Sequence, residues 1–205
     1  LKVPLTVIYS IVIVVFIVLS YYRIDVWNNS NSLFTDVIEK NDRAYIAYNN
    51  RGLTYYEKAD SVIKLGGDKA IINEYFSKAL NDYNKSIEIN AGFAMALSNR
   101  GNVKGMLRDI EGAVKDFEAA VKYNDKLESA YLGLGNANSM LGKTSDALKY
   151  YNIYIKINPN NGGVYYNLGN TYLNLNNRDI ACQNYRKALD LGFIDAEMMV
   201  DKYCI

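Results

Sequence analysis

Apolar residues in this chain recur at spacings of three and four, which is the period of an amphipathic helix. Residues 128–159 show two such stretches, separated by a Leu-Gly-Lys break at 141–143 and ended by Asn-Pro at 158–159. The positions that share one side of each stretch are Tyr131, Leu134, Gly135 and Asn138, then Ala147, Tyr151, Tyr154 and Ile155. The pattern predicts two helices joined by a short turn.

The helix pair recurs with a fixed period of 34 residues. Glycine, alanine and aromatic residues repeat at this interval: Gly101, Gly135 and Gly169; Ala113, Ala147 and Ala181; Phe117, Tyr151 and Tyr185. The small residues are expected where two helices approach closely, and the aromatic ring fills the space beside them. One helix pair cannot bury its apolar side alone, so neighbouring pairs stack. The period therefore predicts an all-α repeat array.

The repeated residues resemble the tetratricopeptide repeat (TPR) pattern. The matching residues are Arg100-Gly101, Ala113, Phe117 and Ala120; Leu134-Gly135, Ala147, Tyr151 and Pro159; and Leu168-Gly169, Tyr172, Ala181, Tyr185 and Ala188. The resemblance implies a right-handed α-solenoid of TPR helix pairs over residues 44–190. Its repeats are expected at residues 44–91, 94–125, 128–159 and 162–190.

The first of these repeats is irregular, because Gly52 precedes Gly101 by 49 residues. The only strong break in between is Gly66-Gly67, and a helical stripe continues upstream of Ala79. Both helices of this repeat are therefore expected to be lengthened, with a turn at residues 65–68 and Asp68 capping the second helix. The protruding hairpin is either a specific contact surface or a neutral insertion at a loop tip, and the neutral insertion is favoured.

The amino-terminal stretch, residues 3–22, contains no charged residue and as a helix would span roughly 30 Å. It predicts a single transmembrane helix within residues 1–23, with a cleaved signal peptide as the alternative. The flanking basic residues Lys2 and Arg23 nearly balance, and the expected orientation places the repeats on the extracytoplasmic side of a single-pass membrane protein. Because the chain begins with Leu1, we expect it to be a fragment of a longer protein.

Residues 24–43 predict a linker and a half-repeat helix. Ser30, Phe34 and Val37 have the spacing of a second repeat helix. The segment after the apolar stretch also resembles the join between the last membrane helix and the TPR region in membrane glycosyltransferases of the protein O-mannosyltransferase type. That resemblance rests on Trp27, Ser30, Leu33, Phe34, Ile38, Glu39 and Lys40. It implies an alternative function, the non-catalytic carboxyl-terminal region of a multi-span glycosyltransferase.

Residues 191–205 predict a short amphipathic capping helix that closes the array. Cys204 lies at its end and Cys182 in the preceding helix. The two cysteines either form a disulfide or remain partly buried thiols. Unpaired thiols are favoured, because a sequence does not supply the Cα–Cα approach that a disulfide needs.

Composition excludes several function classes. The chain has no histidine, which rules out Ser-His-Asp and Cys-His catalytic sets and any histidine-ligated metal within it. The net charge of +1 shows no basic excess, so a nucleic-acid partner is not expected. No metal site, cofactor or enzymatic activity is predicted.

Two rows of asparagines remain to be explained. One row holds Asn50, Asn99 and Asn167, with Gly133 at the equivalent position, and the other holds Asn102, Asn136 and Asn170. Asparagine is unfavourable inside helices, yet its amide offers both a donor and an acceptor. The resemblance implies that first helices line the inner groove and that such asparagines contact peptides. The alternatives are that they bridge helices or reflect an asparagine-rich composition.

The predicted function is therefore a membrane-anchored TPR scaffold that binds a protein or peptide, with the oligomeric state left open. Arg100 takes the packed leucine position of its motif instead of a groove position, and Lys104 is the only other candidate cation. A complete basic clamp for carboxyl-terminal acids is consequently not predicted.

Overall fold

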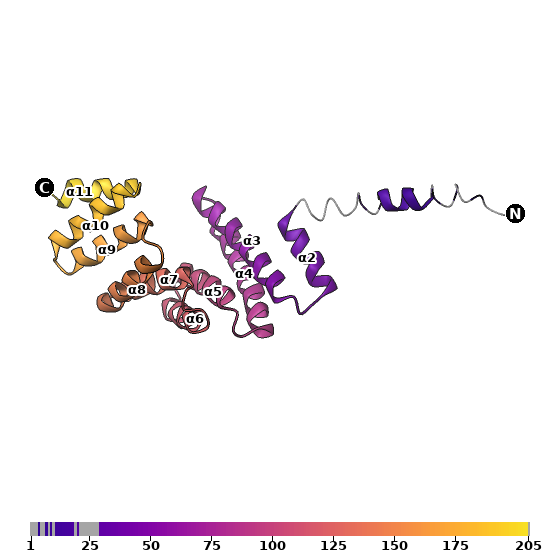
Figure 1. Ribbon diagram of the computed structural model, residues 1–205, viewed down its shortest axis with the longest axis horizontal. Helices are drawn as coiled ribbons and strands as arrows, with labels where there is room; N and C mark the ends of the chain where they lie inside the picture. The colour runs from indigo at the N-terminus through magenta and orange to yellow at the C-terminus, as the bar shows by residue number, and fades with distance from the viewer. Residues whose placement is uncertain are drawn as a thin grey trace. The chain divides into compact units, whose positions relative to one another are not determined.

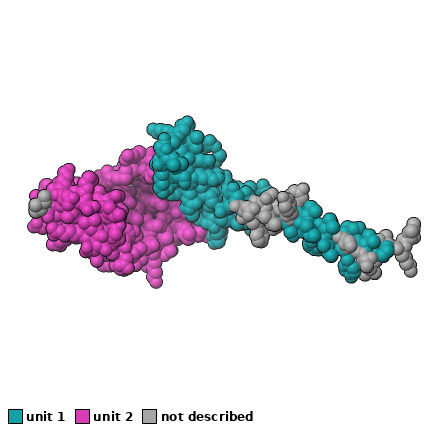
Figure 2. Space-filling model, turned by 90° about the horizontal axis from the view of Figure 1, so that it is seen from above, with its two compact units in different colours: residues 1–89 teal, residues 90–205 magenta. Residues whose placement is uncertain are grey.

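The computed structural model of the chain describes residues 29–204 and, nearer the amino terminus, residues 4, 7, 9, 11–18 and 20. Within these residues every regular element is a helix and none is a strand. The chain forms two compact units, residues 1–89 and residues 90–205 (Figure 2). The prediction of an all-helical, solenoid-like fold is thus confirmed for the described part.

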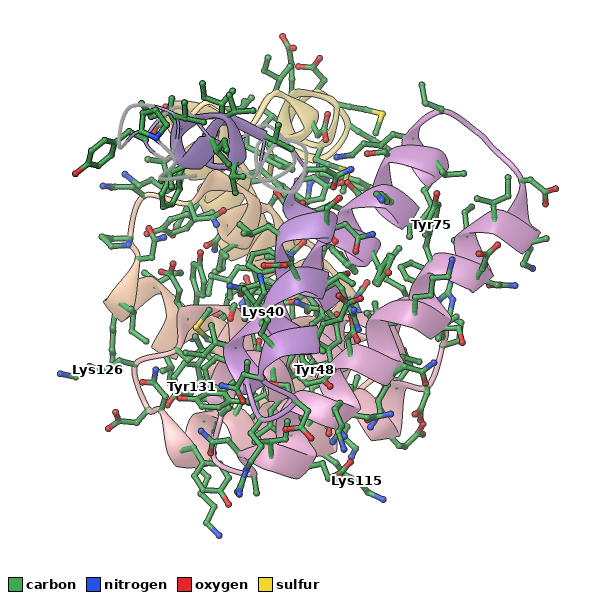
Figure 3. The ribbon with its side chains drawn as sticks, turned by 90° about the vertical axis from the view of Figure 1, so that its right-hand side faces the viewer. Lys40, Tyr48, Tyr75, Lys115, Lys126 and Tyr131 are labelled. Carbon is green, nitrogen blue, oxygen red and sulfur yellow. A yellow bond between two sulfur atoms is a disulfide. The ribbon has the colours of Figure 1, made fainter. Side chains whose placement is uncertain are left out.

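The first unit contains α2 (Ser30–Lys40), α3 (Tyr45–Lys64) and α4 (Lys69–Ile89), with α2 packed on α3 and α3 packed on α4 (Figure 1). The hairpin of α3 and α4 is lengthened, as the extra residues predict. It turns at residues 65–68, and Asp68 Oδ1 accepts a hydrogen bond from the Ala70 backbone N–H at 2.7 Å. Figure 3 shows Tyr75 nearer the tip of this hairpin than Tyr48.

Aromatic rings and lysines hold the two lengthened helices together. Lys58 and Lys78 each lie over the rings of Tyr55 and Tyr75, with nitrogen-to-centroid distances between 5.8 and 6.0 Å. Each such contact contributes about 0.5–1 kcal/mol at an exposed site. The added turns of the hairpin therefore have stabilising contacts of their own.

The second unit contains three helix pairs and a terminal cap. The helices are α5 (Ala94–Met106), α6 (Ile110–Tyr123), α7 (Glu128–Met140), α8 (Thr144–Ile157), α9 (Gly162–Asn174), α10 (Arg178–Asp190), the 3-10 turn η1 (Ile194–Ala196) and α11 (Glu197–Tyr203). Each pair packs on the next, and α7 also contacts α5 while α9 contacts α7. First helices of successive repeats therefore lie beside one another.

The repeated glycines and aromatic residues meet in the core as the sequence predicts. A Cβ atom added at Gly135 would lie 2.4 Å from the Tyr151 ring, and one at Gly169 would lie 2.4 Å from the Tyr185 ring. Tyr151, Tyr185 and Ala147 are almost completely buried. The close approach of the two helices explains why a side chain is absent at these positions.

The predicted transmembrane helix at residues 3–22 is contradicted. No helix among the described residues is both long and apolar enough to cross a membrane. The predicted localisation as a single-pass membrane protein, with the repeats on the extracytoplasmic side, is therefore not supported.

Parts of the amino-terminal predictions fall outside the described residues. These are positions 1–3, 5, 6, 8, 10, 19 and 21–28, which include Trp27 and the first part of the predicted linker. The described part of the predicted linker and half-repeat segment contains the helix α2.

The prediction of free thiols at the carboxyl terminus is wrong, because Cys182 and Cys204 form a disulfide with a Cα–Cα distance of 5.4 Å. Two arginines of α10 add hydrogen bonds to the same end. Arg178 Nε donates to the Tyr203 carbonyl, and Arg186 Nη2 donates to the Cys204 carbonyl at 3.0 Å. The terminal helix is thus fastened to α10 by one covalent bond and two side-chain contacts.

Candidate peptide-binding surface

The six predicted asparagines lie on first helices of their repeats. Asn50 is on α3 in the first unit, Asn99 and Asn102 are on α5, Asn136 is on α7, and Asn167 and Asn170 are on α9. In the second unit the contacts of α7 with α5 and α9 bring five of them onto neighbouring helices. Asn167 Nδ2 donates to Asn136 Oδ1 at 3.0 Å, so the two rows meet between α7 and α9.

Two members of the second row are bonded to buried tyrosines. Tyr151 donates its hydroxyl to Asn136 Oδ1 at 2.9 Å, and Tyr185 donates to Asn170 Oδ1 at 2.8 Å. A hydroxyl buried without a hydrogen-bond partner would cost about 1–3 kcal/mol. These amides therefore supply the acceptor for the tyrosine hydroxyl on the second helix of their repeat. The helix-bridging explanation of the asparagines therefore applies to Asn136 and Asn170.

Asn102 occupies the same position but has a different environment. The aromatic residue of its repeat is Phe117, which has no hydroxyl, and the Asn102 amide has no hydrogen-bond partner among the described residues. Asn136 and Asn170 use only their oxygens, so no described residue accepts a hydrogen bond from either NH2 group. Each of the three amides thus keeps two N–H donors for another acceptor.

The first row is interrupted for a steric reason. At Gly133 an added Cβ would lie 2.4 Å from the Phe117 ring, so this position cannot carry an asparagine without displacing the ring. In the first unit Asn50 Oδ1 accepts from Asn49 Nδ2 at 3.0 Å. Beside the first row, the hydroxyls of Ser98 and Ser129 are 3.0 Å apart and join α5 to α7. Sequence reasoning missed this contact, although its 31-residue separation equals that of Asn136 and Asn167.

Arg100 and Lys104 both form ion pairs with Asp116 of α6. Arg100 donates through Nε and Nη2 at 2.8 and 2.6 Å, and Lys104 Nζ lies 2.8 Å from the same carboxylate. The Asp116 side chain is only 6% exposed. These cations are therefore neutralised inside the repeat, in agreement with the packed position expected for Arg100.

The first unit repeats this arrangement one hairpin earlier. Arg51 donates through Nε and Nη2 to Asp82, both at 2.8 Å, and through Nη1 to Thr35 of α2 at 3.2 Å. The hydrogen bonds with Asp82 raise the pKa of the Arg51 guanidinium. The guanidinium therefore stays charged, and Arg51 links α3 to both α4 and α2. Its signal in the sequence is an arginine before the repeat glycine, together with aspartates 34 residues apart.

Burial controls the ionisation of the repeat tyrosines. Loss of solvation raises the pKa of Tyr185 to about 12, and the same cause raises the pKa of Tyr83 and Tyr151. All three hydroxyls are therefore neutral at physiological pH. In that state Tyr151 and Tyr185 donate to the asparagine oxygens.

Alkaline pH is expected to unfold the repeats by ionising these tyrosines. An unfolded tyrosine loses its proton near pH 10, whereas folded Tyr185 holds its proton to about pH 12. The stabilisation is thus complete below pH 10 and is lost as the pH rises toward 12. Circular dichroism should show a higher alkaline midpoint for Tyr151→Phe/Tyr185→Phe than for the wild type. A variant with an unchanged midpoint would assign the transition to other groups.

The described residues contain no group of three or more histidine, cysteine, aspartate or glutamate side chains able to hold a metal ion. A search against curated proteins found no match. A family model described as tetratricopeptide repeat matches residues 99–162, and a second model with that description matches residues 162–191. The matches give no support to the glycosyltransferase resemblance.

Solved structures show the same fold at low sequence identity. The crystal structure of MamA aligns with a TM-score of 0.62 and 20% identity, covering 80% of this chain and 87% of that chain. A thermophilic TPR protein of Thermus thermophilus gives 0.62 and 16%, covering 91% and 94%. Cut9 with Hcn1, the APC/C hetero-tetramer, gives 0.65 and 17%, covering 80% and 29%.

These proteins are similar to the chain in architecture alone. TPR folds commonly bind protein partners and are generally non-catalytic scaffolds. Residues 99–191 therefore carry tetratricopeptide repeats, and the described part of the chain has the all-helical, solenoid-like fold of proteins built from them.

Proposed function

We propose that the chain is a protein-interaction scaffold that binds an extended peptide segment on the α5, α7 and α9 surface. The observation that carries the proposal is the row of amides at Asn102, Asn136 and Asn170. Each occupies the same position of its repeat, and each has N–H donors with no acceptor among the described residues.

The chemistry of this row suits a peptide backbone. A peptide backbone presents regularly spaced carbonyl oxygens as hydrogen-bond acceptors. The amide N–H groups of the row supply the matching donors without reading the peptide's side chains. The tyrosine hydroxyls bonded to Asn136 and Asn170 fix the orientation of those two amides, which lowers the entropy lost on binding. Asn99 and Asn167 extend the proposed surface along the first row, while Asn50 belongs to the first unit.

The proposed partner is a protein, and the ionic contacts of the repeats support that choice. Arg51, Arg100 and Lys104 each pair with a buried aspartate. A surface that binds the nucleic-acid backbone instead needs unpaired cations facing its phosphates.

The test uses the full chain and a displayed library of random peptides as the probe. Peptides selected on the wild type are titrated against Asn102→Ala/Asn136→Ala/Asn170→Ala. Each lost hydrogen bond contributes about 1 kcal/mol, so the triple variant should bind about a hundred-fold more weakly. Fluorescence anisotropy of a labelled selected peptide measures this change.

The matched control is Tyr151→Phe/Tyr185→Phe, which removes the two hydroxyls but keeps every amide donor. It should bind within a few-fold of the wild type, whereas the triple variant should not. Equal affinity in wild type and triple variant, at unchanged helix content, would refute the proposed surface. An equal loss in both variants would instead assign the effect to repeat packing.

A further inference from the structure

An apolar groove of about 380 Å³ lies in the first unit between α2 and the beginning of α3. Phe34 and Val37 of α2 form one wall, and Ile46 and Ala47 of α3 form the other. Ile46 is 51% exposed. Burying such side chains in a contact releases roughly 25 cal/mol for each Å² removed from water.

The position of this groove follows from the repeat packing. In the second unit, α7 packs against both helices of the preceding pair, α5 and α6, and α9 likewise packs against α7 and α8. In the first unit, α3 packs against α2, as α7 packs against α6 in the second unit. Among the described helices of that unit, none takes the place that α5 has beside α7. The groove on α3 therefore corresponds to the place where α7 of the second unit meets α5 and α6.

Arg43 gives the groove a charge preference. Its side chain lines the groove and is exposed, and it has no carboxylate within salt-bridge distance among the described residues. An occupant with apolar side chains flanked by acidic groups would satisfy both the walls and this cation.

The carboxyl-terminal end of the chain has that chemistry. Ile194 and Met198 are 75% and 67% exposed, which is high for large apolar side chains. Three exposed acidic residues lie near them in the sequence and have no ion pair among the described residues: Asp195, Glu197 and Asp201. The disulfide and the Arg186 hydrogen bond fasten this end to α10, so the surface is ordered before it binds.

We infer that the chain self-associates head to tail, with the η1–α11 end of one molecule docked in the α2–α3 groove of a second copy. Ile194 and Met198 contact the apolar walls, and the acidic residues face Arg43. Each molecule carries both surfaces, so the contact is heterologous and adds further copies. It is separate from the proposed peptide surface on α5, α7 and α9.

The experiment is sedimentation of the full chain over a broad concentration range. The wild type should form species whose average mass rises with concentration. Met198→Glu disables the terminal surface and Ile46→Glu disables the groove, so each variant alone should show a dissociation constant about ten-fold or more higher. Met140→Glu changes a methionine that is 52% exposed on α7 and serves as the matched control, with association unchanged.

Mixing the two disabled variants gives the decisive result. Met198→Glu keeps an intact groove and Ile46→Glu keeps an intact terminal surface, so the mixture should form one-to-one pairs and nothing larger. Arg43→Glu should weaken association, and Glu197→Lys or Asp195→Lys should restore it. A wild type that stays monomeric would overturn the inference. So would association that survives both single variants, or a mixture that does not pair.

Discussion

Asp116→Ala is expected to lower the free energy of unfolding by about 3 kcal/mol, the cost of removing one partner of a buried ion pair. Asp116 is the shared partner of Arg100 and Lys104, and its side chain is only 6% exposed. Without the carboxylate, the partly buried side chains of Arg100 and Lys104, 21% and 25% exposed, would both lose this charged partner. Urea unfolding followed by circular dichroism measures the loss as a lower midpoint with an unchanged slope.

The chain itself supplies the control for this prediction. Two repeats later, Leu168 and Asn184 occupy the positions of Arg100 and Asp116. Arg100→Leu/Asp116→Asn copies that uncharged pair into the earlier repeat. Replacing a buried ion pair is often neutral, and the remaining cation, Lys104, has a side chain that is 25% exposed and reaches water. The double variant should therefore stay within about 1 kcal/mol of the wild type. A loss as large as that of Asp116→Ala would show that the ion pair itself stabilises the repeat.

The sequence predicted those contacts that are fixed by the close approach of the two helices in a repeat. The approach of α7 and α8 leaves no space for a side chain at Gly135 beside the Tyr151 ring, so the period alone locates this contact. The hairpin of α3 and α4 was predictable for a similar reason. Gly66-Gly67 is the only strong break in an otherwise continuous helical pattern.

The contacts of polar groups were less predictable, because each depends on atoms that a period does not place. The bond between Tyr151 and Asn136 needs a hydroxyl, and the Phe117 repeat lacks one at the same position. The sequence already shows phenylalanine at position 117 and tyrosine at position 151. This difference would have predicted that Asn136 bonds to a tyrosine hydroxyl and that Asn102 does not. The apolar composition of residues 3–22 predicted a membrane span, but no helix among the described residues is both long and apolar enough to cross a membrane.

Replacing both cysteines, in Cys182→Ser/Cys204→Ser, is expected to lower the free energy of unfolding by about 3 kcal/mol. The disulfide closes a loop with a sequence separation of 22, and a cross-link of this span restricts the unfolded chain by roughly that amount. Urea unfolding of the variant and of the wild type in reductant should give the same lowered midpoint. Wild type without reductant is the reference.

The same variant should also loosen the terminal helix in the folded state. No residue of α11 is buried, so packing alone contributes little to holding it against α10. Without the disulfide its remaining side-chain contacts include those of Arg178 and Arg186 with the carbonyls of Tyr203 and Cys204. Amide hydrogen exchange should therefore be faster in residues 197–203 of the variant, while exchange in α7 and α8 is unchanged under native conditions. Protection of α11 equal to that of the wild type, together with lower stability, would place the whole effect of the disulfide in the unfolded chain.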